Sequence, residues 1–193
     1  MRFSELIGRY AGETAWIVGK GPSLAFLRDE HFGAGPVMAI NEAVLVVQDL
    51  GLSNHLYGMN KDGCRNESKG HECPMVSPHS DTALILQTPD FSEYCFPNHP
   101  IRFVVNPVDE LGFEHPAVMS VRMCIAIAKL MGCEKIILVC CDSLVNGDVR
   151  IYDGQQTKFS SASDDYLAVI LLVKKDLQDI AHEYILPRKK EIV

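Results

Sequence analysis

The stretch AWIVGKGPS (residues 15–23) joins a short apolar run to a turn that contains two glycines. Apolar runs of this length that end in glycine are typical of buried strands. Pro22 suits the first turn of a helix, because the backbone N–H that proline lacks has no partner there. The stretch therefore predicts a strand at 15–19, a tight glycine turn and a short helix over PSLAFLRDEHF (22–32).

The rest of the chain continues this alternation of strands and helices. We expect further strands at 36–41, 55–60, 83–87, 101–105 and 135–142, and helices at 42–51, 116–132 and 163–182. The run KIILVCCD (135–142) is apolar on both faces, which indicates a strand covered by helices on both sides. The pattern predicts an α/β, Rossmann-like fold with a mostly parallel sheet and helices on both faces.

Length and composition favour a single domain over residues 1–193, because a chain of 193 residues can bury a large core. Residues 61–100 break the alternation and are rich in Pro, His, Ser, Cys and Asn. We expect a long functional loop or a subdomain in that segment. The hydrophobic fraction of 47% also leaves room for a homo-oligomer.

Charge and hydropathy argue against two classes of partner. The formal net charge of −7 argues against general nucleic-acid binding, because such a protein would neutralise few phosphates. No stretch reaches the roughly 18 apolar residues of a membrane span, and the N-terminal sequence has no signal-peptide pattern. With seven cysteines and no export signal, we expect a cytoplasmic protein with reduced thiols.

Cys64, His71, Cys73 and His79 are residue types that bind zinc, and they lie close together in the sequence. Standard zinc sites use two close pairs of ligands, and this spacing does not supply them. A polar surface loop with incidental thiols is the simpler interpretation. We therefore expect no metal site.

Polar residues follow the predicted strands, and the carboxyl ends of parallel strands meet at one edge, where α/β sheets bind ligands. The glycine turn offers close ligand approach and the N–H groups of a helix N-terminus. It matches neither a Walker loop nor the full G-x-G-x-x-G pattern, because Leu24 stands at the third glycine position. A tight turn with Ser23 capping the helix is the alternative. The ligand site predicted from this rule consists of Gly19, Lys20, Gly21, Pro22, Ser23, Asn41, Asn60, Asp62 and Asp142.

His79, His115 and His182 are candidates for a general base by residue type, and Asp142 is a further catalytic candidate at a strand end. None of the three histidines has a visible triad partner or a nucleophile motif. Structural roles are the alternative for each of them, so the sequence leaves the catalytic residue unassigned.

Four segments carry a family resemblance: IVGKGPSL, AINEA, YGMNKDG and SVRMCIAIAKLMGCEKIILVCCDS. They resemble the bacterial family 42 sialyltransferases and a broader family that includes the archaeal 6-hydroxymethylpterin diphosphokinases. The sialyltransferase resemblance implies a CMP-linked sugar as substrate, no further cofactor and no metal. It implies nucleotide contacts from residues 19–23, Asn41, Asn60 and Ser120, with Asp142 near the reacting atoms.

The sequence departs from this family after the strand that ends in Asp142. The family's catalytic histidine follows that strand, whereas residues 144–169 here contain no histidine. Tyr152 and Tyr166 are candidates for the tyrosines that bind the leaving phosphate in the family. Three functions therefore remain open: a metal-independent nucleotide-sugar glycosyltransferase, a nucleotide-dependent diphosphokinase or other phosphotransferase with Mg²⁺ on Asp62 and Asp142, and a non-catalytic nucleotide-binding protein.

Overall fold

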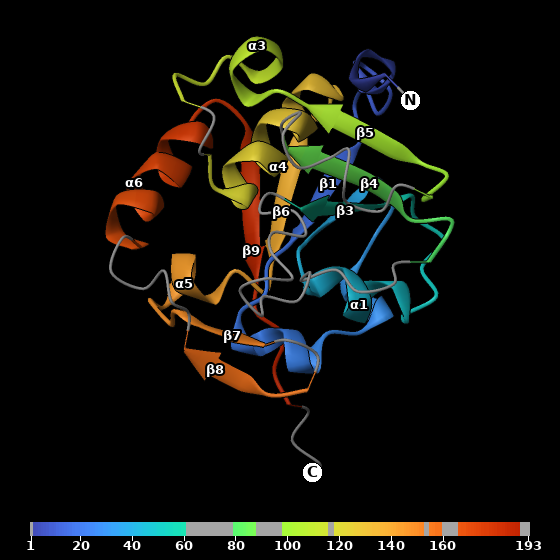
Figure 1. Cartoon of the computed structure of the whole chain (residues 1–193). Helices are drawn as coiled ribbons and strands as arrows, with labels where there is room; N and C mark the ends of the chain where they lie inside the picture. Colours follow the sequence, from blue (N-terminus) through green and yellow to red (C-terminus); the bar gives the residue numbers. More distant parts are fainter. Residues whose placement is uncertain are drawn as a thin grey trace, which may run out of the picture.

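A computed structural model describes residues 2–60, 79–87, 98–115, 118–152, 155–159 and 166–189. Its centre is a seven-stranded parallel sheet in the order β5-β4-β3-β2-β1-β6-β9 (Figure 1). The strands are β1 (Thr14–Val18), β2 (Val37–Ile40), β3 (Leu56–Asn60), β4 (Ala83–Gln87), β5 (Arg102–Val105), β6 (Lys135–Val139) and β9 (Ala181–Ile185). The α/β, Rossmann-like fold predicted from the sequence is confirmed.

The central strands are buried on both faces, as their apolar runs predict. β1 pairs with β2 on one side, where Trp16 lies opposite Val37, and with β6 on the other, where Trp16 lies opposite Ile137. Ile17 and Val18 are both fully buried, and they pack into different cores because successive side chains point to opposite faces.

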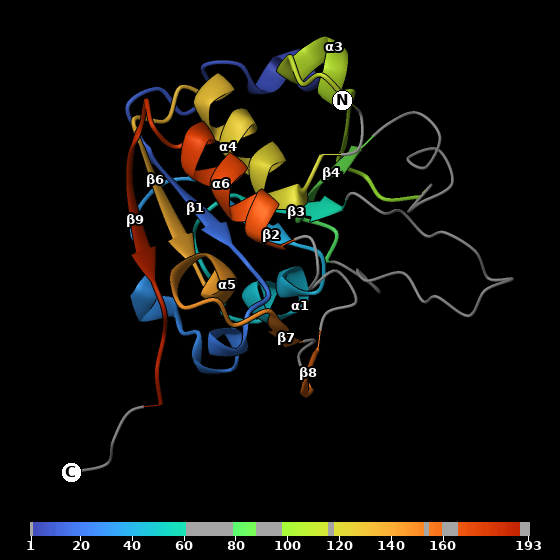
Figure 2. The same cartoon turned by 90° about the vertical axis from the view of Figure 1, so that its left-hand side faces the viewer.

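Helices cover both faces of the sheet. The 3-10 helix η1 (Phe3–Leu6), α3 (Pro107–Leu111), α4 (Ser120–Leu130) and α6 (Tyr166–Asp176) pack on one face, and α6 lies beside α4 (Figure 2). The other face carries α1 (Ala43–Gln48) and the 3-10 helices η2 (Pro22–Phe26) and η3 (Asp29–His31). The short helix α5 (Asp142–Val145) follows β6. This arrangement leaves the carboxyl edge of the sheet bordered by loops and helix N-termini.

A small hairpin stands apart from the central sheet. It consists of the antiparallel strands β7 (Arg150–Tyr152) and β8 (Thr157–Phe159). The backbone N–H of Tyr152 donates a hydrogen bond to the carbonyl oxygen of Lys20 at 2.7 Å, which attaches β7 to the glycine turn after β1. The hairpin therefore lies beyond the carboxyl ends of the strands (Figure 2).

Two helix predictions are wrong in part. The helix expected over 22–32 is two 3-10 helices, because the chain is extended at Leu27 (φ −64°, ψ 139°). The helix expected over 163–182 ends at Asp176, and His182 lies in β9, paired with Ile136 of β6. β9 is a polar edge strand with three exposed residues at its start, so it lacks the apolar run that reveals the other strands.

The segment 61–100, expected to be a long loop or a subdomain, contains one strand of the central sheet. This strand is β4, whereas residues 61–78 and 88–97 lie outside the described residues.

Within the described part of the chain, no helix has both the length and the apolar character needed to cross a membrane.

Candidate functional site

The order of the strands places a switch point between β1 and β6. From β1 the chain proceeds outward through β2, β3, β4 and β5, and it then returns to the other side of β1 as β6. In open α/β sheets, ligands bind outside the carboxyl ends of the strands at such a point. Here the glycine turn (residues 19–23) and the segment 140–142 lie side by side, joined by a hydrogen bond of 2.9 Å from Gly21 N–H to the Cys140 carbonyl oxygen.

Both glycines of the turn are required by contacts within the protein. A Cβ atom on Gly19 would lie 2.7 Å from the carbonyl oxygen of Cys140, and a Cβ atom on Gly21 would lie 2.0 Å from Oδ2 of Asp142. Neither distance is compatible with a side chain. The segment after β6 therefore approaches the two glycines as closely as the sequence pattern suggested that a ligand would.

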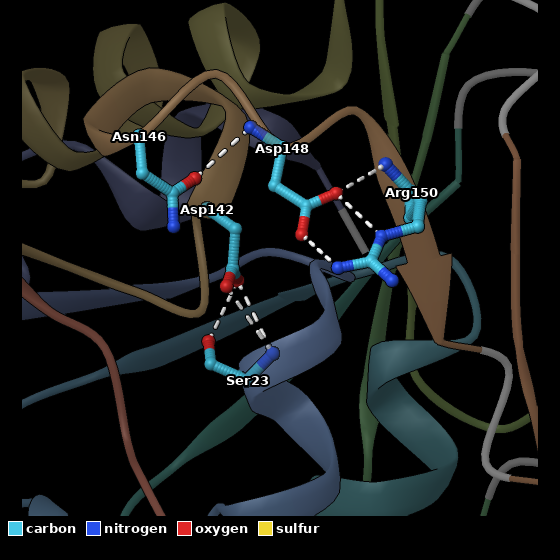
Figure 3. Close-up of polar contacts among 5 residues, drawn as sticks. All are labelled: Ser23, Asp142, Asn146, Asp148 and Arg150. Atoms are coloured by element: carbon cyan, nitrogen blue, oxygen red, sulfur yellow. Dashed lines mark hydrogen bonds and ion pairs between the residues drawn. The ribbon is translucent and has the colours of Figure 1, made fainter.

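The donors of Ser23 are bound to Asp142 (Figure 3). The Ser23 hydroxyl donates to Oδ2 of Asp142 at 2.6 Å, and the Ser23 N–H lies 3.3 and 3.4 Å from the two carboxylate oxygens. Both side chains are buried. Asp142 thus occupies the place near η2 where the sequence predicted an anionic phosphate. Ser23 does not cap η2, because Gly21 is the N-cap residue and the Ser23 side chain is bonded to Asp142.

Lys20, the cation of the turn, also has a partner. Its ammonium group lies 3.0 Å from Oε2 of Glu42, the residue that follows Asn41 at the end of β2. Both side chains are half-buried, so the pair is shielded from water in part. The charge of Lys20 is therefore balanced by the protein itself.

Buried polar side chains gather at the carboxyl edge of the sheet. Such groups are costly to bury unless they are hydrogen-bonded, so each of them needs a partner in the protein, in water or in a ligand. Gln87, the last residue of β4, was missed by the sequence analysis, although a polar residue that ends an apolar run was the signal for it. Among the described residues seven polar side chains are buried, and six of them lie at this edge: Ser23, Asn41, Asn60, Gln87, Ser120 and Asp142.

Asn41 has two unusual features. Its φ of 50° lies in the left-handed region, and Cys140 on the other side of β1 has a φ of 55°. Residues other than glycine rarely adopt this conformation; asparagine adopts it more readily than most, and such conformations cluster at functional sites. The side-chain oxygen of Asn41 is also buried without a hydrogen-bond partner among the described residues. A ligand that offers an N–H or O–H group would satisfy it.

The structure does not bring the predicted histidines into this group. His79 lies next to β4 at the opposite edge of the sheet, 3.9 Å from Asp49. His115 lies in the loop between α3 and α4, where it lines a groove with α6, and His182 is exposed on β9. Of the catalytic candidates, Asp142 is the one that belongs to the buried polar group. Asp62 lies outside the described residues.

The residues of zinc-binding type in the sequence fall mainly outside the described ranges. Cys64, His71 and Cys73 lie outside the described residues. Within the described ranges, no three side chains of the His, Cys, Asp or Glu type stand together in a way that could hold a metal ion.

Four buried cysteines are free thiols with raised pKa values. Cys124, Cys133, Cys140 and Cys141 are all buried and free. Burial raises the pKa of Cys133 to about 11 and that of Cys141 to about 12, and it also raises the pKa of Cys140. At neutral pH these groups are protonated, so they act as packing residues and not as nucleophiles.

The two tyrosines that the family resemblance suggested come from elements outside the central sheet. Tyr152 lies on β7, where its ring packs against the core next to η2, and Tyr166 begins α6. The buried polar side chains at the carboxyl edge can accept hydrogen bonds from hydroxyl, amine and amide groups and can donate hydrogen bonds to them.

In comparisons with known proteins, no family model and no curated protein matches the chain.

Proposed function

We propose that the protein binds the nucleotide part of a nucleotide sugar at the carboxyl edge of its sheet and transfers the sugar, as a metal-independent, sialyltransferase-like glycosyltransferase. The resemblance supports this, because its segments fall on β1, β2, β3, α4 and β6, whose ends meet at this edge. The observation that carries the proposal is the buried Asn41 side-chain oxygen without a partner among the described residues, in a group of buried polar side chains.

In this proposal the residues of the edge divide the work. Asn41 accepts a hydrogen bond from an N–H or O–H group of the nucleoside, and Asn60 and Ser120 bind neighbouring polar atoms. Asp142 fixes the glycine turn through Ser23 at 2.6 Å and is a positioning residue. During transfer the bond between the sugar and the phosphate breaks, a bond to the acceptor oxygen forms, and a base takes the proton of the acceptor hydroxyl.

A second candidate function is a nucleotide-binding protein without catalysis. The placement of two candidates for the general base favours this function, because His79 and His182 lie away from the buried polar group. Asp142 is also committed to two donors of Ser23, which leaves its carboxylate less available to accept a proton. Binding by Asn41 and Ser120 would be the same in both candidates.

Incubation with CMP-sialic acid separates these functions. We expect slow release of CMP without an acceptor, at the same rate with and without a chelator. Replacing Ser120 with alanine should lower this rate about tenfold, the effect of one lost hydrogen bond. Replacing Ser53, an exposed serine at the opposite edge, should leave it unchanged.

The other outcomes assign the other functions. Activity that requires ATP and Mg²⁺ and stops with the chelator would replace the transferase by a phosphotransferase. Binding of CMP without any release from CMP-sialic acid would support the non-catalytic candidate. Loss of activity in the Ser53 variant alone would contradict the placement of the site.

A further inference from the structure

The phosphate of a nucleotide ligand needs a cation or free donors, and the glycine turn supplies few of either. Lys20 is paired with Glu42 at 3.0 Å. The hydroxyl and the N–H of Ser23 are directed at the carboxylate of Asp142. A phosphate at this turn would lie against that carboxylate, and two like charges at short distance repel each other.

The hairpin brings another cation to the same place. β7 is attached to the turn by the hydrogen bond from Tyr152 N–H to the Lys20 carbonyl oxygen, and the Tyr152 ring packs against the core next to η2. Side chains two residues apart on a strand share a face, so Arg150 lies on the same side of β7 as Tyr152. Figure 3 shows Arg150 bound to Asp148, on the strand that follows the segment from Asp142.

Arg150 is held in a fixed orientation by Asp148. The Arg150 Nε atom donates to Oδ1 of Asp148 at 2.8 Å, and Nη2 donates to Oδ2. The Asp148 N–H is in turn bonded to Oδ1 of Asn146 at 2.9 Å. The hydrogen bond from Arg150 lowers the pKa of Asp148, and hydrogen bonding by Asp148, with a smaller contribution from the Asp142 charge, raises that of Arg150. Both groups therefore remain charged at neutral pH.

Part of the guanidinium group is available. An arginine has five N–H donors, and Asp148 accepts from two of its nitrogens, while Nη1 has no partner among the described residues. Arg150 is thus paired with a carboxylate, as Lys20 is, but its side chain is 48% exposed whereas that of Lys20 is 26% exposed, so its remaining donors are more accessible. A planar guanidinium that is already oriented fits the oxygens of a phosphate.

We propose that Arg150 binds the phosphate of the nucleotide ligand, from β7 at the rim of the site next to the glycine turn. This inference rests on the proposed function, because it assigns a residue to the phosphate of that ligand. It also moves the phosphate site from the glycine turn, where the sequence pattern suggested it, to the hairpin.

Calorimetric titration with CMP and with cytidine tests the assignment. Replacing Arg150 with glutamine should weaken CMP binding at least about tenfold, because hydrogen bonds between charged groups are the strong ones. The affinity for cytidine, which lacks the phosphate, should stay within about twofold. Arg9→Gln is the matched control: it removes the same charge from the opposite edge of the sheet and should change neither affinity.

The outcomes are distinguishable. If the wild-type protein binds CMP and Arg150→Gln binds it equally well, the assignment of Arg150 is overturned and the proposed function stands. An equal loss in Arg150→Gln and Arg9→Gln would also overturn it, since a general charge effect would then explain the result. If the wild-type protein binds neither CMP nor cytidine, the proposed function is overturned and this inference falls with it.

Discussion

Replacing Gly21 with alanine is expected to lower the free energy of unfolding by about 3 kcal/mol, at the upper end of the usual cost of overpacking. The backbone conformation of Gly21, with φ −67° and ψ 168°, is open to any residue, so the cost arises from contact alone. The new Cβ atom would lie 2.0 Å from Oδ2 of Asp142. Moving Asp142 away would also leave the buried donors of Ser23 without their partner. Urea denaturation measures the change.

A double-mutant cycle isolates this contact. In an Asp142→Ala background, the oxygen nearest to the new methyl group is absent, although the Cβ atom of residue 142 still lies 2.8 Å away. Gly21→Ala should therefore cost at least about 1 kcal/mol less in that background than in the wild type. An equal cost in both backgrounds would contradict the packing of the glycine turn against Asp142.

Replacing Asn41 with glycine is expected to weaken CMP binding about tenfold or more and to leave the free energy of unfolding within about 1 kcal/mol of the wild type. Glycine adopts the φ of 50° without strain, which compensates for the greater freedom of the unfolded chain. The lost side chain takes with it a buried oxygen that has no partner in the described part of the protein. Titration with CMP and urea denaturation give the two quantities.

Asn54 provides the matched control for this substitution. Its side-chain nitrogen donates to the carbonyl oxygens of Gly33 and Gly35 at 2.8 and 2.7 Å, at the opposite edge of the sheet. Asn54→Gly should therefore reduce stability and leave CMP binding unchanged. The account of Asn41 is wrong if Asn41→Gly behaves like Asn54→Gly, with reduced stability and unaltered binding.

The sequence predicted those parts of the fold that depend on long apolar runs. The strands around Ile17 and Leu138 are buried on both faces, and their composition shows this directly. β9 was missed because an edge strand such as AHEYI needs only one paired neighbour and tolerates polar residues on its surface. Its apolar neighbour, α6, made a longer helix the simpler prediction.

The sequence predicted which polar residues gather at the carboxyl edge of the sheet, but not how they are connected. Asn41, Asn60 and Asp142 follow from the rule that polar residues at strand ends meet at one edge, and the structure brings them to that edge. Ser120, which the family resemblance suggested, begins α4 at the same edge. The bond between Ser23 and Asp142 joins residues 119 positions apart, which no local pattern reveals. The same limit applies to the two glycines, because their sequence pattern is the same whether a ligand or the protein's own chain packs against the turn.

Hydrogen exchange of the backbone amides, measured with and without CMP at about a hundredfold its dissociation constant, tests the central claim most directly. Binding at that concentration stabilises the folded protein by about 2.7 kcal/mol, so slowed exchange is readily measured. The account predicts the strongest additional protection at residues 41–44 and 120–123, with little change at residues 8–13 and 33–36 beyond that global stabilisation. Protection centred on residues 8–13 and 33–36, or no protection at all, would contradict a nucleotide site at the carboxyl edge of the sheet.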